Sequence, residues 1–526
     1  MKHYRPVVLV ILDGWGETKE VLGNPFCQAV LPTIKKLNRH YPKTLCQASG
    51  LSVGLPWGVC GNSEVGHQTL GTGQVIYQNL PLISLAIKKG DFFRNQILLE
   101  AFQRAKERHK KVHFLGLLSD GGVHSHIDHL LALLEMSKKI GINPVIHLFS
   151  DGRDAPQKSF EKYWLILKEK MTELKIGKIG SVMGRFYGMD RNKNWERTEL
   201  AYRALVFGQG ISVQEEDLLS EIKKRYEQEQ TDEFIQPIVI SDEKGQSLGR
   251  IAEGDEIIFF NFRRDRGRQI SQALLNSQKV PFLKNTQGPK ITLTAFIDYD
   301  DQLELKTVFA FPEPTAFLGE ELAKAGKKQL RIAETEKYAH VTYFFNGGKE
   351  KPFTGEERIL VESKKVATYD LAPEMGAKEI TDKLLNELEK NYFDFILVNF
   401  ANPDMVGHTG NLAAAVKALE AVDFQLGRLV DKVLEKGGSL LISADHGNVE
   451  EMVNLKNGEV DTEHSLNPVP CWLVAKDFFR EERQEKDLEN VYGMLVDIPP
   501  TILELLGMPK NSKMDGTSLL EIMLRD

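Results

Sequence analysis

The chain has 526 residues, of which 42% are hydrophobic and 27% are charged. That length corresponds to about three or four ordinary domains and allows a sizeable core, and the composition is that of a soluble globular protein. The 67 basic and 74 acidic side chains give a net charge of −7, whereas a non-specific nucleic-acid binder is expected to be net basic, so the charge argues against that class.

The four cysteines form no C-x-x-C pair and are too few for a disulfide framework, which fits a reducing compartment. The apolar run Val7–Leu12 is too short for the hydrophobic region of a signal peptide. No stretch approaches the roughly 18 apolar residues that a membrane span needs. We therefore expect a cytoplasmic protein that does not enter a membrane.

Strand-like apolar runs alternate with helix-like segments, which predicts an α/β fold. Three runs are followed by acidic residues: Val7–Leu12 by Asp13, Phe393–Asn399 by Asp404, and Ser439–Ser443 by Asp445 and His446. Near-continuous apolar strands indicate a sheet buried on both faces, and open α/β sheets bind ligands beyond the carboxyl ends of their strands. A helix cap or an Asx turn would explain one such aspartate but explains three poorly.

The long interval between these strand ends predicts an inserted domain, because one sheet does not easily absorb roughly 300 intervening residues. Proline-containing crossings near Tyr77–Pro81 and Phe311–Pro314 are the candidate linkers. We expect a discontinuous domain over 1–77 and 311–526, interrupted by an inserted domain over 78–310. The insert holds 14 of the 22 arginines although it is less than half of the chain, so arginine is concentrated there.

The carboxylates and imidazoles near the strand ends form a candidate metal-ligand set. Its members are Asp13, Asp404, His408, Asp445, His446 and His464. Asp404 and His408 are spaced i, i+4, which places both side chains on one face of a helical turn. Mixed carboxylate and imidazole ligation suits Mn²⁺ or Zn²⁺ better than Ca²⁺. The set is too large for one ion with open positions and predicts two ions about 4 Å apart, as used for in-line phosphoryl displacement.

Ser63 lies between glycines in Gly61–His67. As an isolated feature it is better explained as a helix N-cap. In a chain that also carries a two-metal set, a nucleophile is the better interpretation, because metal coordination would activate the hydroxyl and a helix N-terminus favours a phosphoryl group.

Three glycine-flanked segments concentrate arginine: Asp151–Asp154, Gly184–Arg191 and Asn261–Arg268. Arginine forks bind phosphate and carboxylate bidentately. Since each segment also carries aspartate, surface ion pairs are an alternative, and an RNA-contacting surface is another. The segment Ser119–His129 contains H-x-H-x-x-H, which could be a separate zinc site, but its glycines favour a loop in which one histidine reaches substrate and the others cap the next helix.

Together these motifs resemble, in order and over essentially the whole chain, those of the cofactor-independent phosphoglycerate mutases. The matching segments are Asp13–Gly16, Gly61–His67, Ser119–His126, Asp151–Asp154, Gly184–Arg191, Glu334–Thr342, Asn402–Gly410 and Ala444–Asn448. The resemblance implies an alkaline-phosphatase-like three-layer α/β domain interrupted by a smaller α/β domain. It implies an isomerase of glycolysis and gluconeogenesis that interconverts 3-phosphoglycerate and 2-phosphoglycerate through a phosphoserine.

The resemblance also implies cofactors and partners. We expect two Mn²⁺ ions, with Co²⁺, Mg²⁺ or Zn²⁺ as substitutes, and no requirement for 2,3-bisphosphoglycerate. The expected partner is the small phosphoglycerate, with neither nucleic acid nor membrane involved, and the expected assembly is a monomer. Two rival interpretations are a hydrolase of the same fold, such as a phosphatase, phosphodiesterase or sulfatase, and a non-catalytic binder derived from such an enzyme.

Carried over motif by motif, the resemblance gives each residue a role. Ser63 is the phosphorylated nucleophile, Asp154 the candidate acid/base and Lys337 a cation that neutralises phosphoryl charge. One metal is held by Asp404, His408 and His464, and the other by Asp13, Ser63, Asp445 and His446. The substrate is contacted by His124, Arg153, Asp154, Arg185, Arg191, Arg263, Arg266 and Lys337.

Two positions depart from the family pattern. The usual Phe-Arg-Pro-Asp-Arg reads Phe262-Arg263-Arg264-Asp265-Arg266 here, so the proline that would stiffen this loop is replaced by a charge. Cys60 stands where methionine is usual, and its thiol could make the site sensitive to oxidation or could be inert packing.

Overall fold

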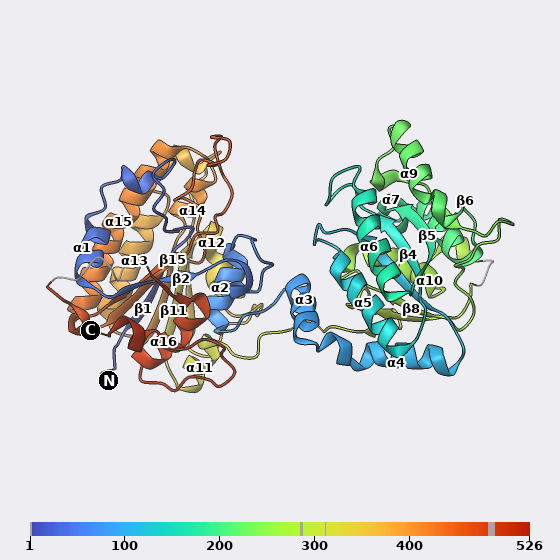
Figure 1. Ribbon diagram of the computed structural model, residues 1–526. Helices are drawn as coiled ribbons and strands as arrows, with labels where there is room; N and C mark the ends of the chain where they lie inside the picture. Colours follow the sequence, from blue (N-terminus) through green and yellow to red (C-terminus); the bar gives the residue numbers. More distant parts are fainter. Residues whose placement is uncertain (1–2, 285–287, 311, 482–489, 526) are drawn as a thin grey trace. The chain divides into compact units, whose positions relative to one another are not determined.

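The structure is a computed structural model that describes residues 3–284, 288–310, 312–481 and 490–525. The chain forms two compact units. Unit 1 comprises Met1–Tyr77 and Pro312–Asp526, and unit 2 is Gln78–Phe311. Phe311, at which the sequence places the second domain boundary, lies outside the described residues. Each unit contains one eight-stranded sheet combined with helices (Figure 1), so the predicted α/β class is confirmed.

The sheet of unit 1 has the order β12-β11-β13-β1-β14-β15-β2-β16. Its strands are β1 (Val7–Leu12), β2 (Lys43–Gln47), β11 (Gln329–Glu334), β12 (Glu356–Val361), β13 (Phe395–Phe400), β14 (Ser439–Ser443), β15 (Val469–Val474) and β16 (Val491–Met494). Only β15 runs against the others. The carboxyl ends of β11, β13, β1 and β14 therefore meet at one edge of the sheet.

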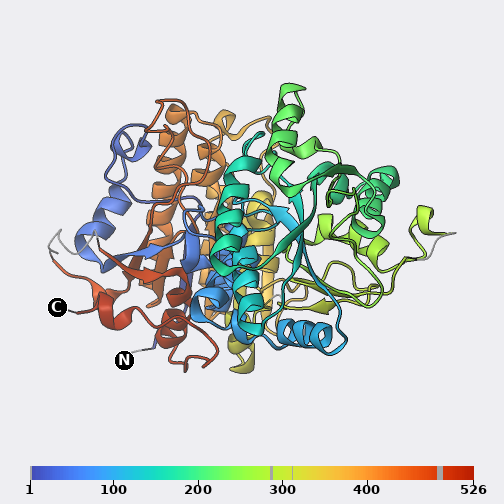
Figure 2. The same ribbon diagram turned by 45° about the vertical axis from the view of Figure 1, so that its right-hand side comes forward.

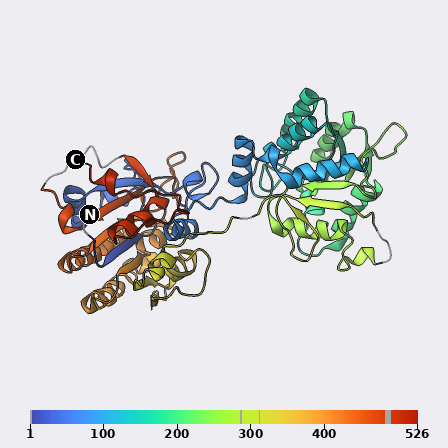
Figure 3. The same ribbon diagram turned by 90° about the horizontal axis from the view of Figure 1, so that it is seen from below.

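Helices cover both faces of this sheet (Figures 1 and 3). One face carries α1 (Pro32–His40), α13 (Ala377–Lys390) and α15 (Leu412–Glu435), and α15 lies beside α13 (Figure 2). The other face carries α2 (Ser63–Thr72), α11 (Leu318–Lys324) and α16 (Ile498–Leu505). Because both faces are covered, every residue of β1 is buried, as its unbroken apolar sequence predicts.

The predicted strand bounds are met by β1 and β14, whereas β13 begins two residues later than predicted. The cause is Asp394, whose carboxylate accepts a hydrogen bond from Lys328 N at 2.9 Å and so belongs to the turn before the strand.

The sheet of unit 2 has the order β10-β9-β8-β3-β4-β5-β7-β6. Its strands are β3 (Val112–Leu118), β4 (Val145–Ser150), β5 (Lys178–Gly184), β6 (Ile211–Val213), β7 (Ile238–Ile240), β8 (Glu256–Phe259), β9 (Thr292–Ala295) and β10 (Lys306–Thr307). β7 pairs antiparallel with β5, and β6 runs parallel to β7. The remaining strands are mutually parallel.

Separate apolar cores fill the two faces of this second sheet. One is built with α3 (Asn79–Lys89), α4 (Gln96–Glu107), α5 (Ile127–Ile140), α6 (Phe160–Leu174) and α9 (Leu218–Glu227). The other is built with α8 (Trp195–Tyr202) and α10 (Arg264–Leu274). Residues 119–126 form a loop and His126 is the N-cap of α5, as the loop interpretation predicts, whereas His129 is buried inside α5 and does not cap it. Within the described ranges, no helix is long and apolar enough to cross a bilayer.

Candidate active site

Four strands of unit 1 deliver charged side chains to the same edge of its sheet. Asp13 follows β1, and Asp445 and His446 follow β14. The short helices α14 (Asn402–Gly407) and α12 (Thr335–Ala339) follow β13 and β11 and carry Asp404 and Lys337. All five side chains are buried. The topology of the sheet therefore brings the strand-end residues together, as predicted.

Ser63 reaches the same place from α2. Asn62 is the N-cap, because its Oδ1 accepts a hydrogen bond from Val65 N at 3.0 Å, so the interpretation of Ser63 as a cap is wrong. A side chain on Gly66 would place its Cβ 2.5 Å from the carbonyl oxygen of Asp445. The glycine thus lets the first turn of α2 lie directly against the end of β14.

The hydroxyl of Ser63 lies among the charged groups. Its Oγ is 2.9 Å from His446 Nε2 and 3.3 Å from Asp13 Oδ1, and it accepts a hydrogen bond from Lys337 Nζ at 2.7 Å. The same Nζ lies 2.6 Å from Asp13 Oδ1 and 2.6 Å from Asp404 Oδ2. A buried serine oxygen held between an ammonium and an imidazole is a candidate nucleophile.

Charge compensation controls protonation in this cluster. Burial alone would lower the pKa of Lys337, but the Asp13 and Asp404 carboxylates raise that pKa well above its usual range. Burial and the neighbouring Asp445 raise the pKa of Asp13. For Asp404, burial is outweighed by Lys337 and the nearby histidines, which hold the pKa well below its ordinary value. Lys337 is therefore the cation that offsets the cost of burying Asp404, whereas burial and Asp445 oppose ionisation of Asp13.

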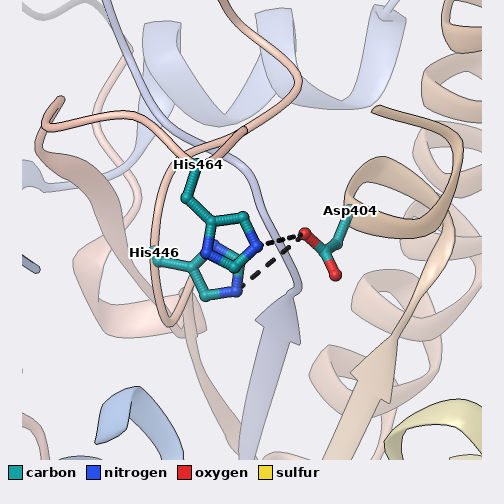
Figure 4. A group of neighbouring side chains, drawn as sticks. All are labelled: Asp404, His446 and His464. Atoms are coloured by element: carbon teal, nitrogen blue, oxygen red, sulfur yellow. Dashed lines mark ion pairs between the residues drawn. The ribbon is translucent and has the colours of Figure 1, made fainter. Parts of the chain in front are cut away.

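Three histidines surround Asp404 with their Nε2 atoms turned inward. His408 Nε2 and His464 Nε2 lie 3.3 Å and 3.4 Å from Asp404 Oδ1, and His446 Nε2 lies 4.0 Å from it. Figure 4 shows His446 and His464 directed at the same carboxylate oxygen, and their rings stack with centroids 4.0 Å apart. The Nδ1 atoms face the carbonyl oxygens of Thr462, Gly61 and Gly447.

This orientation is the one expected of metal ligands. A ligating imidazole usually gives its other N–H to a carbonyl, which leaves the Nε2 lone pair for the metal. His408 Nε2 and His464 Nε2 are 3.1 Å apart, close enough for one cation to contact both. Asp404 raises the pKa of His408 by hydrogen bonding, and it also raises the pKa of His464 against the opposing effect of burial.

A second group of possible ligand atoms belongs to Asp13, Asp445 and His67. Asp445 Oδ1 accepts hydrogen bonds from Gly14 N and His446 N, whereas its buried Oδ2 lies 3.1 Å from His67 Nδ1, a nitrogen that also donates to Ser63 O at 2.8 Å. The buried ligand atoms of Asp13, Asp445 and His67 lie close enough together to hold one cation. Burial notwithstanding, His446 and His67 hold the pKa of Asp445 below its ordinary value, so it is ionised.

His67 is the residue of this site that sequence reasoning missed. Its Nδ1 donates to Ser63 O at 2.8 Å and lies 3.1 Å from Asp445 Oδ2, and its Nε2 accepts from Asn399 Nδ2 at 3.1 Å. Asn399 Nδ2 also donates to Asp13 Oδ2 at 2.7 Å. The i, i+4 spacing of Ser63 and His67 on an amphipathic turn was the available signal.

In unit 2, the predicted substrate residues also lie together, except for Lys337, which belongs to unit 1. Arg185 Nη1 contacts Asp151 Oδ1 at 2.6 Å and Asp154 Oδ2 at 2.5 Å, and His124 Nε2 lies 3.7 Å from Asp154. Arg191 and Arg263 converge on Asp265, a carboxylate that the prediction omitted, at 2.5 Å and 3.3 Å. That group occupies the carboxyl end of the unit 2 sheet, where β3, β4, β5 and β8 end.

Two more arginines complete the group. Arg266 donates to Met189 O at 3.0 Å, and burial together with the charges of Arg185, Arg191 and Arg153 lowers its pKa. Arg153 is exposed and turns toward Glu233 at 3.5 Å. Burial and Arg185 lower the pKa of His124 to about 4, so its imidazole is neutral near pH 7. The group therefore presents clustered guanidinium groups beside a neutral imidazole, which suits an anion.

Both positions that depart from the family pattern have defined surroundings. Arg264 donates to Tyr299 O at 3.1 Å and pairs with Asp301, and it lines the same cavity as Asp265. Burial and the charge of Glu451 raise the pKa of the Cys60 thiol. Because a reactive cysteine needs a lowered pKa, inert packing is the better interpretation of Cys60.

Known proteins resemble this chain over nearly its whole length. The family model described as Metalloenzyme superfamily matches residues 5–510. A protein of Clostridioides difficile named 2,3-bisphosphoglycerate-independent phosphoglycerate mutase is 49% identical over 98% of this chain and 99% of its own length. A relative of the same name from Clostridium perfringens is also 49% identical, with the same coverage. The crystal structure of Leishmania mexicana phosphoglycerate mutase at low cobalt concentration is 29% identical, covers 98% of this chain and 97% of its own, and superposes with a TM-score of 0.52.

Proposed function

The chain belongs to the 2,3-bisphosphoglycerate-independent phosphoglycerate mutases and is an enzyme of that family. From this premise we propose that it interconverts 3-phosphoglycerate and 2-phosphoglycerate through a phosphorylated Ser63 at a dinuclear metal site. The observation that carries the proposal is the position of Ser63 Oγ, 2.7 Å from Lys337 Nζ and 2.9 Å from His446 Nε2. A hydroxyl so placed can become a phosphate ester while its charge is compensated.

The ligand atoms of unit 1 fit two divalent cations. We assign one to Asp404, His408 and His464, and the other to Asp13, Ser63, Asp445 and His446, with His67 and Asn399 orienting the second set. The mixed nitrogen and oxygen donors suit Mn²⁺, and Co²⁺, Mg²⁺ or Zn²⁺ are possible substitutes. Such ions, when bound, supply Lewis acidity to the serine oxygen and to the phosphoryl oxygens.

The arginine group of unit 2 holds the glycerate in this proposal. Arginine forks recognise carboxylate and phosphate bidentately, and Arg185, Arg191, Arg263 and Arg266 provide several such forks, with Arg153 and neutral His124 beside them. Asp154 is the acid/base for the glycerate hydroxyls, since it accepts from Arg185 and lies near His124. Retention of the alcohol distinguishes a mutase from a phosphatase.

The reaction then consists of two displacements of opposite direction. Ser63 Oγ attacks phosphorus as the alkoxide, its proton having been released to solvent before the step; the Oγ–P bond forms, and the bond from phosphorus to the glycerate oxygen breaks. Asp154 gives a proton to that oxygen. The retained glycerate presents its other hydroxyl, which attacks the phosphoserine while Asp154 takes its proton. Lys337 Nζ, bonded to Ser63 Oγ, neutralises charge on the phosphoryl oxygens in both steps.

The test is an assay of 2-phosphoglycerate formation from 3-phosphoglycerate, run without 2,3-bisphosphoglycerate and with Mn²⁺. We expect turnover by the unaltered protein, none by Ser63→Ala, and unchanged turnover by the control Ser52→Ala, whose hydroxyl donates to Ser49 O at 2.7 Å. Phosphate labelled in the substrate should appear on Ser63 in quenched reactions. Isomerisation by Ser63→Ala would refute the phosphoserine route, and release of inorganic phosphate in place of 2-phosphoglycerate would identify a hydrolase.

A further inference from the structure

The segment Asn261–Arg266 connects the end of β8 to the start of α10 and carries Arg263 and Arg266. Phe262 fixes the middle of this segment, because its N donates to His124 O at 2.7 Å and its O accepts from Asn79 Nδ2 at 2.6 Å. Beyond Phe262 the chain enters the first turn of α10, where Arg263 is half exposed. The positions of both guanidinium groups therefore depend on what holds that turn.

Tyr299 holds one side of the turn. Its ring is fully buried, stacks edge-on against Phe259 with centroids 5.0 Å apart, and lies so close to Gly267 that a Cβ there would be 2.7 Å from the ring. Its hydroxyl donates to Asn261 O. One side chain thus connects the end of β8 to the first turn of α10.

Two arginines of α10 bind the backbone of the same tyrosine. Arg264 Nε and Arg268 Nε donate to Tyr299 O at 3.1 Å and 3.2 Å. They are spaced i, i+4 and so lie on one face of the helix. Arg264 also pairs with Asp301, and Arg268 Nε lies 3.9 Å from Asp300. Arg266, two residues after Arg264, lies on the other side of the helix axis, whereas Arg264 and Arg268 line the same cavity as Arg191 and Asp265.

We propose that Arg264 is a positioning residue, which fixes the first turn of α10 through its contact with Tyr299 and thereby orients Arg263 and Arg266. The identity of the substrate that these two arginines bind rests on the proposed function. Arg264 is the first residue of α10, where backbone amides lack helical partners and the helix end frays readily. Arg264 donates to the backbone carbonyl of Tyr299, whose side chain is buried. This hydrogen bond holds the N-terminal end of α10 in place. The competing explanation is that Arg264 acts only by adding positive charge near the substrate.

Two substitutions at this position separate the explanations. Arg264→Ala removes both the charge and the support. Arg264→Pro removes the same charge but fixes the helix start by its ring, because proline is preorganised at the first helical position. The backbone accepts proline here, since Arg263 is already extended at φ −125° and ψ 128°. Arg203→Ala is the matched control, because Arg203 is 46% exposed against 45% for Arg264 and also pairs with a carboxylate.

We expect Arg264→Ala to raise the KM for 3-phosphoglycerate about fivefold, the effect of one net hydrogen bond. The value of kcat should stay within about twofold, because glycerate is bound equally in ground and transition states. Arg264→Pro and Arg203→Ala should keep KM within about twofold of the unaltered protein. Equal increases of KM for alanine and proline would overturn the proposal in favour of the charge explanation.

Amide hydrogen exchange over residues 261–267 tests whether Arg264 stabilises the start of α10, and it needs no measurement of enzyme activity. Exchange there should be faster in Arg264→Ala than in the unaltered protein, and Arg264→Pro should restore the slow rate. Unchanged exchange in Arg264→Ala would overturn the proposal even if the enzyme is active. Altered exchange in a protein that does not isomerise phosphoglycerate would instead refute only the proposed function.

Discussion

Replacement of Lys337 tests whether its ammonium group stabilises the folded protein by neutralising the buried carboxylates around it. Its Nζ lies 2.6 Å from Asp13 Oδ1 and 2.6 Å from Asp404 Oδ2, and the side chain is 4% exposed. Lys337→Met keeps the length of the side chain but leaves buried carboxylates without their cation. Removing one partner of a buried ion pair costs about 3–5 kcal/mol. At about 2 °C per kcal/mol, as for large domains, this corresponds to a melting temperature roughly 6–10 °C lower.

Divalent metal should reverse part of this loss. Bound cations would contact the carboxylates that Lys337 now neutralises, and binding to the folded state alone stabilises it by mass action. We therefore expect Mn²⁺ to raise the melting temperature of Lys337→Met by more than that of the unaltered protein. Activity should nevertheless fall at least about 100-fold in the presence of Mn²⁺, the usual cost of removing one donor from a charge-stabilising site.

The assay is thermal unfolding of chelator-treated protein with and without added Mn²⁺. Lys378→Met is the matched control, because the Lys378 side chain is 78% exposed and its pair with Asp382 should contribute little. If metal-free Lys337→Met has the same melting temperature as the unaltered protein, the buried carboxylates do not need Lys337 for stability and the reasoning fails. Equal stabilisation of both proteins by Mn²⁺ would refute the second part.

Three further outcomes follow from the geometry. His67→Phe keeps a ring but loses both imidazole hydrogen bonds, so Mn²⁺ affinity measured by calorimetry should fall about 10–100-fold; an unchanged affinity would remove His67 from the site. Gly66→Ala would force a Cβ to 2.5 Å from Asp445 O and move Ser63, so turnover should be lost while the control Glu64→Ala, on the exposed side of the same turn, stays active. Burial lowers the pKa of both His113 and His147; since the unfolded state then binds more protons, stability should fall as pH drops below about 6.5, by up to about 1.4 kcal/mol per pH unit for each histidine. Urea unfolding of His147→Gln from pH 7.5 to 5.5 should show a slope smaller by about one proton, and an unchanged slope would contradict this assignment.

The positions of the strand-end residues were predictable because they depend on one rule of topology. Asp13, Asp404 and Asp445 each follow an apolar run, and the carboxyl ends of parallel strands share an edge. The order of the strands did not matter for this inference, as long as β1, β13 and β14 were parallel neighbours, which they are. The α/β class followed from the same alternation of apolar runs and helical segments.

His67 and Asn399 were missed because their roles depend on packing between elements. Asn399 is one polar residue inside the buried strand β13, and the sequence does not show that its amide reaches Asp13 and His67. The rotation of α2 about its axis decides whether His67 faces the sheet, and that rotation is set by the contact of Gly66 with Asp445. Long-range packing of this kind leaves no local pattern in either segment.

The arginine segments show how two sequence interpretations can both be partly correct. The aspartates that suggested surface ion pairs do pair with the arginines, as Arg185 does with Asp151 and Asp154. However, Arg185 is 1% exposed, and a buried guanidinium with two carboxylates is no surface pair. Since a buried pair is costly to desolvate, it is weak evidence for stability, and a role in holding an anion accounts better for its burial. We therefore expect Asp151→Asn, which removes one of the two negative charges that share Arg185 Nη1, to change the KM for phosphoglycerate more than the melting temperature, and the reverse pattern would restore the structural interpretation.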